Sequence, residues 1–440
     1  MQIDWDSLVK TYDVRGLVGT ALTTEIVTAL AAGFVDELGA AGQDVVVGHD
    51  MRDSSPEFAD AFAVGAQARG ANVVSIGLCS TDESYFASGI FNAPAAMFTA
   101  SHNPAAYNGI KFSRAGARGI SLDTGLAAIR DRAKVYLAEG LEEVDEPGSY
   151  REEHILVRYA SYLREMVNLD GIRPLKVVVD AANGMGGMTV PAVLGTGTDL
   201  HQLPLEIIPM YFELDGTFPN HEANPLDPKN LVDLQRAVVE HGADIGLAFD
   251  GDADRVFVVD EKGDAVTPSA VAAIVARREI AREQAINPGA PITVLHNLLT
   301  SRIVEEVIEA DGAKPVKTRV GHSLIKDKMA ETNAIFGGEH GCLDFEAVLL
   351  EGVLGFAAGL LPQFRAEGGE FFLYGGWQAR YVHLEAQAAL ELRPELSQFV
   401  IDGTHGSLLD QAEHLVGGWV DAALEEEVGG HFANHCPRVL

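Results

Sequence analysis

The chain has 440 residues, of which 47% are hydrophobic and 22% are charged, so it is long enough for about three or four domains with sizeable cores. This composition excludes a disordered or low-complexity protein. With 32 basic and 64 acidic side chains, the formal net charge is -32, which disfavours binding to nucleic acid and to anionic membranes. An anionic substrate would therefore require a local positive site or a metal ion.

No segment of the sequence indicates a membrane span or a secretion signal. The longest clearly apolar run, Val353 to Leu361, is far shorter than the roughly 20 residues that a membrane helix needs. The N-terminal segment lacks a basic flank followed by an apolar stretch. The 3 cysteines are widely spaced, which is typical of reduced thiols. We expect a cytoplasmic protein without nucleic-acid or membrane partners, either a monomer or a weak homo-oligomer.

The chain contains three short runs of β-branched residues, and each is followed by a polar turn and an amphipathic stretch. They lie at 44–48, 175–179 and 292–295. Alternation of such strands with helices is typical of βαβ units. Because the runs lie more than a hundred residues apart, they predict three related α/β domains with mixed sheets rather than a short-period solenoid.

Stretches rich in Gly, Pro and acidic residues mark the predicted breaks between domains. The breaks lie at 141–149, 260–264 and 362–370. The predicted domains are α/β units at 1–148, 149–260 and 261–365, followed by a smaller, atypical α+β domain at 366–440.

The segment DGDADR at 250–255 lies between two apolar runs, which predicts a tight loop between two strands. Its carboxylates, Asp250, Asp252 and Asp254, stand at alternate positions and can converge on one hard cation such as Mg²⁺ or Ca²⁺. An EF-hand is excluded because Arg255 stands where that motif requires Gly. A solvated acidic turn is the alternative interpretation, although repulsion among three carboxylates without a cation disfavours it.

The segment TASHNP at 99–104 follows an apolar stretch and predicts a hydroxyl on a sharp turn. It differs from the Gly-x-Ser-x-Gly elbow, and adjacent side chains rarely face each other, so Ser101 and His102 do not suggest a hydrolase triad. We interpret Ser101 as a serine that accepts a phosphoryl group, whose charge a metal at the Asp loop neutralises. An ordinary Ser/His/Asn turn is the alternative.

Three further segments carry polar side chains suited to a ligand. In GHSLIK at 321–326, His322 offers a titratable imidazole and its neighbours offer donors for sugar hydroxyls. In GGEH at 337–340, the glycines permit close approach of a ligand and Glu339 can bind hydroxyls. Near the N-terminus, Arg15 in YDVRG is suited to a phosphate.

Together these segments resemble the α-D-phosphohexomutases, specifically the phosphomannomutase/phosphoglucomutase branch. TASHNP looks like the phosphoserine loop of that family, DGDADR like its metal loop, and GHSLIK and GGEH like its sugar-facing loops. Supporting matches occur in the family's order over roughly the first three-quarters of the chain. They are YDVRG at 12–16, GHDMRDSSP at 48–56, STDESYFASG at 80–89 and FPNHEANPLDPKNL at 218–231.

The resemblance implies four domains around a cleft and interconversion of mannose or glucose 1-phosphate and 6-phosphate. The implied intermediate and activator is a hexose 1,6-bisphosphate, and the implied cofactor is Mg²⁺, bound by phosphorylated Ser101 and the Asp loop. The implied metal ligands are Ser101, Asp250, Asp252 and Asp254. The implied catalytic residues are Ser101, His102, Lys111, Arg255 and His322. The implied substrate-binding residues are Tyr12, Arg15, Gly321, Ser323, Lys326 and Glu339.

After His340 the resemblance ends. The family's fourth domain carries an Arg-x-Ser-(Gly/Asn)-Thr-Glu-Pro loop that binds the distal phosphate, and residues 345–440 contain no such segment. Each missing charge-assisted hydrogen bond is worth about 1.5–3 kcal/mol, and binding energy of this kind orients a substrate. Two alternatives to a mannose or glucose phosphomutase therefore stay open: a catalytically impaired phosphosugar-binding homologue, and a phosphoglucosamine mutase.

Overall fold

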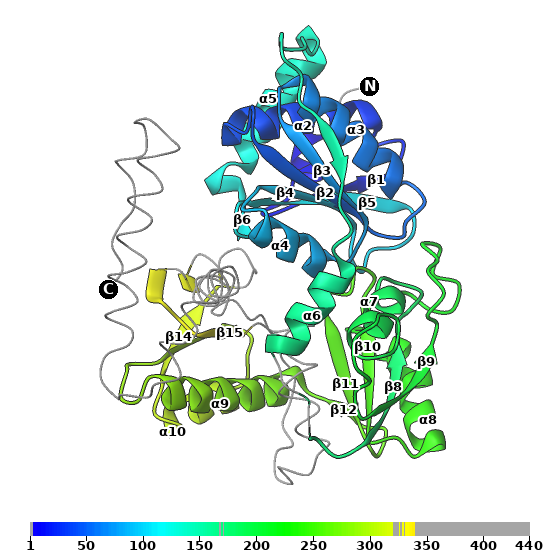
Figure 1. Ribbon diagram of the computed structural model, residues 1–440, viewed down its shortest axis with the longest axis vertical. Helices are drawn as coiled ribbons and strands as arrows, with labels where there is room; N and C mark the ends of the chain where they lie inside the picture. The colour runs from blue at the N-terminus through cyan, green and yellow to red at the C-terminus, as the bar shows by residue number, and fades with distance from the viewer. Residues whose placement is uncertain are drawn as a thin grey trace, which may run out of the picture. The chain divides into compact units, whose positions relative to one another are not determined.

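The structure, a computed structural model, describes residues 3–166, 169, 171–319, 325, 328–329 and 331–338 (Figure 1). These residues form three sheets with helices packed against them. The three α/β domains expected from the sequence are therefore confirmed. The α+β domain expected at 366–440 lies outside the described residues.

The first sheet is mixed. Its strands are β1 Val14–Leu17, β2 Asp44–His49, β3 Asn72–Leu78, β4 Ala95–Phe98, β5 Tyr107–Arg114, β6 Arg118–Gly119 and β7 Tyr150–Glu152. Their order is β1-β5-β4-β2-β3-β7, with β6 added to β5. The strands from β4 to β7 in this order are parallel, whereas β1 and β5 are antiparallel to their neighbours. The helices are α1 Trp5–Leu8, α2 Thr24–Leu38, α3 Ser55–Ala68, α4 Thr81–Ile90 and α5 Leu126–Glu139.

The second sheet is also mixed and has five strands in the order β12-β11-β10-β8-β9. Its strands are β8 Leu175–Asp180, β9 Leu205–Met210, β10 Ile245–Phe249, β11 Val256–Asp260 and β12 Ala265–Val266. The helices of this part are α6 Leu156–Met166, α7 Gly186–Val193 and α8 Val232–His241. The tight loop predicted at 250–255 joins the antiparallel strands β10 and β11.

The third sheet is parallel over its described strands, in the order β14-β13-β15. Its strands are β13 Thr293–Asn297, β14 Lys314–Thr318 and β15 Phe336–Gly338. The helices α9 Pro268–Ile286 and α10 Arg302–Ala310 pack against each other in this domain.

The three sheets repeat one arrangement of strands. In each, a central strand (β2, β8 or β13) has a parallel neighbour on either side. In the first two sheets, one of these neighbours (β4 or β10) continues through a loop into an antiparallel strand (β5 or β11). Ser101 lies in the first of these loops and Asp250 in the second, so the two motifs occupy equivalent positions. Gly338 ends β15 at the corresponding point of the third sheet.

Continuous apolar runs explain the central strands. Residues 45–47 of β2 are all buried, which is typical of a parallel strand covered on both faces. Some of the helices begin at a side chain that accepts a backbone hydrogen bond. Thr23 caps α2 by accepting from the backbone N–H of Ile26, and Ser301 caps α10 by accepting from that of Ile303.

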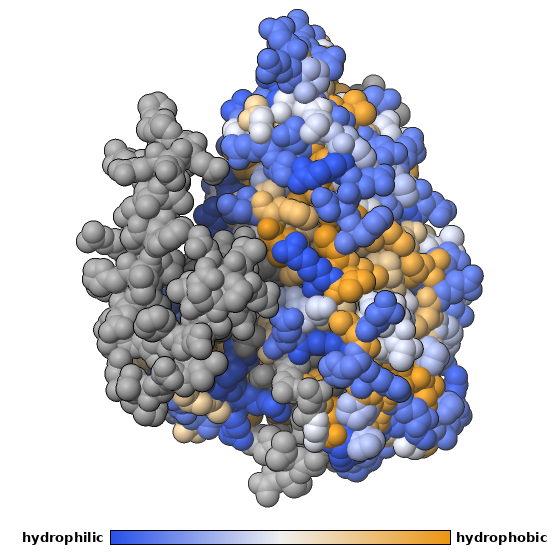
Figure 2. All heavy atoms as spheres, in the orientation of Figure 1, coloured by the Kyte–Doolittle hydropathy of each residue, from blue (hydrophilic) through white to orange (hydrophobic). Residues whose placement is uncertain are grey.

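The surface carries many hydrophilic side chains (Figure 2). Hydrophilic side chains cover much of the visible face, particularly over the first domain (Figure 2). Within the part of the chain that the structure describes, no helix combines the length and apolarity that crossing a membrane requires.

The start of α4 is fixed by a reciprocal pair of hydrogen bonds. The Ser80 hydroxyl accepts from the backbone N–H of Glu83 at 3.2 Å, and the Glu83 carboxylate accepts from the backbone N–H of Ser80 at 3.1 Å. Glu83 is 1% exposed. Burial raises the pKa of its carboxyl to about 8, although the Ser80 N–H favours the charged form.

This burial predicts a pH-dependent effect of Glu83→Gln. Because the pKa of Glu83 is raised on folding from 4.5 to about 8, the folded state binds the proton more tightly, and stability from this group falls as pH rises through that window. The neutral amide removes this loss. Relative to wild type, we expect the variant to gain at most about 1.4 kcal/mol per pH unit in that window, measured by urea denaturation.

Glu25→Gln is the matched control for Glu83→Gln. Glu25 lies exposed in the first turn of α2, and its pKa is lowered, mainly by a hydrogen bond from the Thr23 hydroxyl. The stability of Glu25→Gln relative to wild type should therefore fall as pH rises below about 4.5, and it should not change between pH 4.5 and about 8. A Glu83→Gln difference that does not vary with pH would contradict the buried, protonated state of this carboxyl.

Candidate active site

Ser101 lies on the sharp turn that the sequence predicted, in the loop between β4 and β5. Its φ is 51°, in the left-handed region, where a residue with a side chain is strained by about 1–3 kcal/mol. The Thr99 hydroxyl supports the turn by accepting from the Ser101 N–H at 2.8 Å. Ser101 is 1% exposed, so its hydroxyl must find partners within the protein.

The Asp loop folds tightly on itself. The backbone N–H of Asp250 donates to the carbonyl of Arg255 at 3.1 Å, and that of Ala253 donates to the carbonyl of Asp250 at 3.2 Å. The three carboxylates, predicted to converge, each offer an oxygen within 4.8 Å of the others, and all three residues are buried.

The loop that carries Ser101, residues 99–106 (the serine loop), directly contacts the loop at 250–255 (the Asp loop). The Ser101 hydroxyl donates to Asp250 Oδ2 at 2.8 Å. A Cβ on Gly251 would lie 2.6 Å from the carbonyl oxygen of Ser101, so a glycine is needed where the two backbones approach. The backbone N–H of Met185 in turn donates to the Gly251 carbonyl at 2.9 Å. The first and second domains therefore hold the serine and the carboxylates in one cluster.

Two buried cations balance the carboxylates. Lys111 reaches from β5 and donates to Asp252 Oδ2 at 2.7 Å and to Asp254 Oδ2 at 2.6 Å. Arg255 Nε donates to Asp250 Oδ2 at 2.9 Å, and its Nη2 contacts the hydroxyl of Ser101. Both cations thus touch the carboxylates, and Arg255 also touches the serine.

The pKa values of these groups follow from burial and from their partners. Burial acts to lower the pKa of Lys111, but Asp252 and Asp254 outweigh it and hold the pKa well above its ordinary value. Burial acts to raise the pKa of Asp252, but Lys111 and Arg255 hold it well below its usual range. For Asp250, burial dominates and raises the pKa of the carboxyl, against the opposing effect of Arg255. Lys111 is therefore charged, and Asp252 is its carboxylate partner.

His102 and Arg15 border this cluster. Nδ1 of His102 accepts from Arg255, and burial together with Arg255 and Arg15 lowers the His102 pKa to about 3. His102 is therefore neutral at neutral pH. Arg15 donates to Asn103 Oδ1 at 2.6 Å and to Asp13 Oδ2 at 2.7 Å, so it lies against the serine loop.

The remaining predicted site residues fall into two groups. Tyr12 is half-buried just before β1. The others lie outside the described residues, so their placement stays a prediction; they are Gly321, His322, Ser323, Lys326 and Glu339.

Two residues of the cluster were not assigned from the sequence. Thr81, the first residue of α4, donates from its hydroxyl to Asp252 Oδ2 at 2.6 Å. Its backbone N–H also donates to the Asp252 carbonyl at 3.1 Å. Arg52 donates to the backbone carbonyl of Ser101 at 2.8 Å. Both residues lie in motifs that matched the family pattern, and this match was the available signal.

The carboxylate cluster fits a hard divalent cation. Oδ1 of Asp252 and Oδ1 of Asp254 are buried without a hydrogen-bond partner among the described residues, although Arg255 Nε lies 3.4 Å from the latter. Leaving a buried carboxylate oxygen without a donor is unfavourable. Carboxylate oxygens are the ligands that Mg²⁺ takes in proteins. The donor set therefore matches the predicted metal site.

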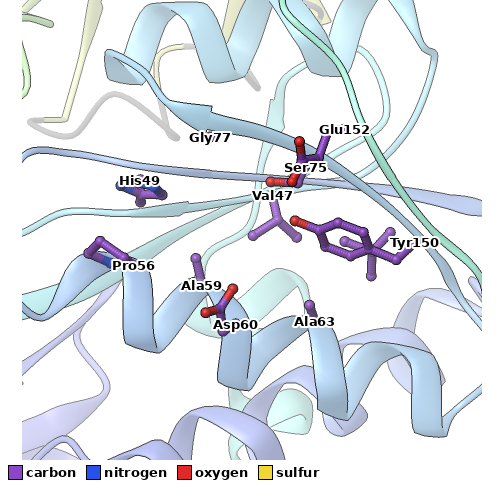
Figure 3. Close-up of a pocket in the computed structure, with 11 residues that line it drawn as sticks. Val47, His49, Pro56, Ala59, Asp60, Ala63, Ser75, Gly77, Tyr150 and Glu152 are labelled. Atoms are coloured by element: carbon purple, nitrogen blue, oxygen red, sulfur yellow. The ribbon is translucent and has the colours of Figure 1, made fainter.

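A cavity of about 170 Å³ lies apart from this cluster, between α3 and the strands β2, β3 and β7 (Figure 3). Its polar lining consists of His49, Asp60, Ser75, Tyr150 and Glu152, with small apolar side chains between them. None of the predicted site residues lines this cavity.

Family models for the alpha/beta/alpha domains I, II and III of phosphoglucomutase/phosphomannomutase match residues 6–136, 157–263 and 267–342. The phosphomannomutase of Vibrio cholerae is 37% identical over 336 residues, which cover 75% of this chain and 70% of that protein. The phosphomannomutase/phosphoglucomutase of Pseudomonas aeruginosa is 37% identical over 336 residues, which cover 76% of this chain and 68% of that protein.

Solved structures agree with the sequence matches. A phosphoglucomutase/phosphomannomutase family protein from Burkholderia thailandensis superposes with a TM-score of 0.70 at 29% identity, covering 81% of this chain and 76% of that chain. The fold described above is therefore shared with this group of proteins.

The contact between the two loops predicts the effect of Gly251→Ala. The added Cβ would lie 2.6 Å from the Ser101 carbonyl oxygen, and neither backbone can move away cheaply. Overpacking of this kind costs about 1–3 kcal/mol, and we expect a loss of that size in the free energy of unfolding measured with urea.

Ala253→Gly is the control in the same loop. Ala253 has a φ of 56°, so glycine relieves its strain while making the unfolded chain more flexible. We expect its free energy of unfolding to stay within about 1 kcal/mol of wild type. Equal stability of Gly251→Ala and wild type would show that the loops do not touch as described.

Proposed function

This chain belongs to the phosphoglucomutase/phosphomannomutase family, and we propose that it interconverts the 1-phosphate and 6-phosphate of mannose, glucose or both. The single observation that carries this proposal is the contact of the Ser101 hydroxyl with Asp250 and Arg255, from a serine loop and a metal loop that both match the family pattern. The proposed ligand is a phosphosugar.

The proposed reaction has two phosphoryl transfers. In the first, the bond between phosphorus and Ser101 Oγ breaks and a bond forms from phosphorus to a hydroxyl of the hexose phosphate. That hydroxyl loses its proton to a base, and Ser101 Oγ takes up a proton as it leaves. The product is a hexose 1,6-bisphosphate, which turns in the site and returns its other phosphoryl group to Ser101. Because the protein contributes little covalent chemistry to phosphoryl transfer, most of the rate enhancement comes from positioning the reactants and neutralising their charge.

The described residues supply parts of this chemistry. Arg255 is buried against Ser101, and Lys111 is buried against Asp252 and Asp254 of the Asp loop, where both can stabilise charge on the transferring group. Arg15 lies against the same loop and is suited to a phosphate. Lys111 and His322 are the proposed proton-transfer groups, and Lys111, being charged, can act there only as a proton donor. Neutral His102 lies beside the proposed nucleophile. Glu339 and the segment 321–326 are proposed to bind the hydroxyl groups of the sugar.

The proposed cofactor is Mg²⁺, held by Asp250, Asp252, Asp254 and an oxygen of the phosphate on Ser101. When bound, the ion neutralises charge on the phosphoryl group and the carboxylates. A hexose 1,6-bisphosphate serves as the activator that loads Ser101 in a resting molecule.

A phosphosugar-binding homologue with impaired turnover is the second candidate. Residues 345–440 lack the Arg-x-Ser-(Gly/Asn)-Thr-Glu-Pro segment that the family uses for the distal phosphate. Binding energy from a remote phosphate is what orients a substrate for turnover. This candidate keeps the serine and Asp loops and predicts phosphorylation of Ser101 without measurable isomerisation.

One experiment separates the two candidates. Purified protein is incubated with Mg²⁺ and glucose 1,6-bisphosphate, and the site of phosphorylation is read by mass spectrometry while isomerisation of mannose, glucose and glucosamine 1-phosphates is assayed. We expect phosphate on Ser101, turnover of mannose or glucose 1-phosphate, and loss of both in Ser101→Ala. Ser75→Ala is the control. It changes a serine that lines the cavity between α3 and β2, β3 and β7, and it should retain phosphorylation of Ser101 and turnover.

The outcomes of this experiment are distinct. Phosphorylated Ser101 without isomerisation favours the binding homologue, and turnover of glucosamine 1-phosphate alone favours the phosphoglucosamine mutase. Absence of phosphate on Ser101 under all conditions rejects the proposed mechanism.

Removal of one carboxylate tests the metal site independently of activity. We expect titration calorimetry with Mg²⁺ to show an affinity at least about tenfold lower for Asp252→Asn than for wild type, because an anionic oxygen ligand is lost. Asp123→Asn, on the exposed surface of the first domain, should bind Mg²⁺ as wild type does. Unchanged Mg²⁺ affinity in Asp252→Asn would place the metal elsewhere, and EDTA should abolish turnover in the wild type.

A further inference from the structure

Arg52 is a buried cation that the proposed reaction does not use. It follows β2 by three positions and is 2% exposed. Its guanidinium has five N–H donors, and each of them has an acceptor. Nε donates to Asp50 Oδ2 at 3.2 Å. The other four donate to backbone carbonyls, those of Ser101 at 2.8 Å, Asn103 at 2.7 Å, Pro104 at 3.0 Å and Tyr107 at 3.0 Å.

These four carbonyls all belong to the serine loop and its junction with β5. A loop of this kind turns its carbonyl groups inward, where each needs a donor. One planar guanidinium supplies all of them, and Asp50 fixes its orientation while also accepting from the Ser55 hydroxyl at 2.6 Å. Lysine has three donors without a planar fork and cannot reproduce this pattern.

The Ser101 carbonyl is the critical member of the set. Ser101 has a left-handed φ of 51°, so its peptide orientation depends on neighbouring contacts. Arg52 binds that carbonyl from one side, while Gly251 of the Asp loop approaches it from another. The direction of the Ser101 hydroxyl toward Asp250 therefore depends on where Arg52 holds the main chain.

Arg52 also contacts the second domain. Its guanidinium carbon lies 5.1 Å from the ring centroid of Phe218, a cation–π contact. A Cβ on Gly216 would lie 2.7 Å from the Cα of Arg52, so the segment that carries Phe218 approaches the Arg52 backbone closely. One side chain thus touches the serine loop of the first domain and a loop of the second.

We propose that Arg52 is a positioning residue for phosphoryl transfer: it holds the main chain of the serine loop so that Ser101 faces the Asp loop. The residue does not touch the transferring group. The kinetic consequence rests on the proposed function, whereas the effect on the serine loop does not.

The test compares Arg52→Ala and Arg52→Lys with Arg69→Ala. Arg69 is a matched control because it too pairs with an aspartate (Asp36, 3.0 Å), donates to a backbone carbonyl (Glu142, 3.2 Å) and stacks on a ring (Tyr136, 5.7 Å), but it does not contact the serine loop. Hydrogen exchange of residues 99–107 is measured by mass spectrometry, together with kcat and KM for the preferred hexose 1-phosphate.

We expect faster exchange at 99–107 and a fall in kcat of about 10²-fold with little change in KM for both Arg52 variants, since a small misplacement of a reacting group has an effect of that order. Arg69→Ala should match wild type in both measurements. Guanidinium ion added to Arg52→Ala should restore part of the lost kcat, and it should not raise the kcat of Arg69→Ala. A merely structural role would not produce this rescue.

Each other outcome also decides the question. Wild-type exchange and kcat in Arg52→Lys overturn the proposal, as does a loss in Arg52→Ala that follows the unfolded fraction and is not rescued. If Arg52→Ala does not fold, Arg52→Lys alone decides on the same criteria. If the wild-type protein shows no turnover, the proposed function fails, and faster exchange at 99–107 in the variants still supports the positioning role.

Discussion

Three carboxylates buried in one loop are the constraint on which the site depends. Folding buries Asp250, Asp252 and Asp254 together, and each buried charge without a partner costs several kcal/mol of stability. Arg255 comes from the same loop, but Lys111 comes from β5 of the other sheet. The charge balance of the second domain therefore requires the first domain to be in place. The same contact brings Ser101, on the loop just before β5, against Asp250.

The repeated strand arrangement explains why these loops can meet. Both follow a strand that lies parallel to the central strand of its sheet and both continue into an antiparallel strand. Equivalent loops therefore emerge at the carboxyl ends of parallel strands, where α/β folds bind ligands. Lys111 pairs with Met97 across the β4–β5 hairpin. The register of that hairpin therefore determines where the Lys111 side chain lies relative to Ser101 and the carboxylates. A one-residue shift of this register would turn Lys111 to the other face of the sheet.

Much of this could be predicted from the sequence because it is local. Apolar runs predict the strands around Ser101 and Asp250, and alternate carboxylates in one loop predict the convergence of their oxygens. Arg52 and Thr81 contact partners that lie 49 and 171 residues away in the sequence. No local sequence pattern predicts contacts between residues so far apart. Arg52 stands in a turn beside acidic and hydroxyl residues, where an arginine would ordinarily be solvated. Its burial is a property of the folded serine loop, whose carbonyls need donors.

The proposed phosphorylation of Ser101 would change the electrostatic balance of the cluster. In the hydroxyl form, Ser101 donates a hydrogen bond to Asp250, and this donor disappears when Oγ is esterified. The phosphate adds a charge of about -1.5 to -2 beside three carboxylates. Lys111 and Arg255 are already paired with those carboxylates, so the phosphorylated form requires further positive charge at this point. The proposed divalent cation at the Asp loop would supply it. Arg15 lies against the serine loop, where it donates to the Ala100 carbonyl. Under the proposed function, a chain of net charge -32 can thus bind an anionic substrate because the compensating positive charge is concentrated around Ser101.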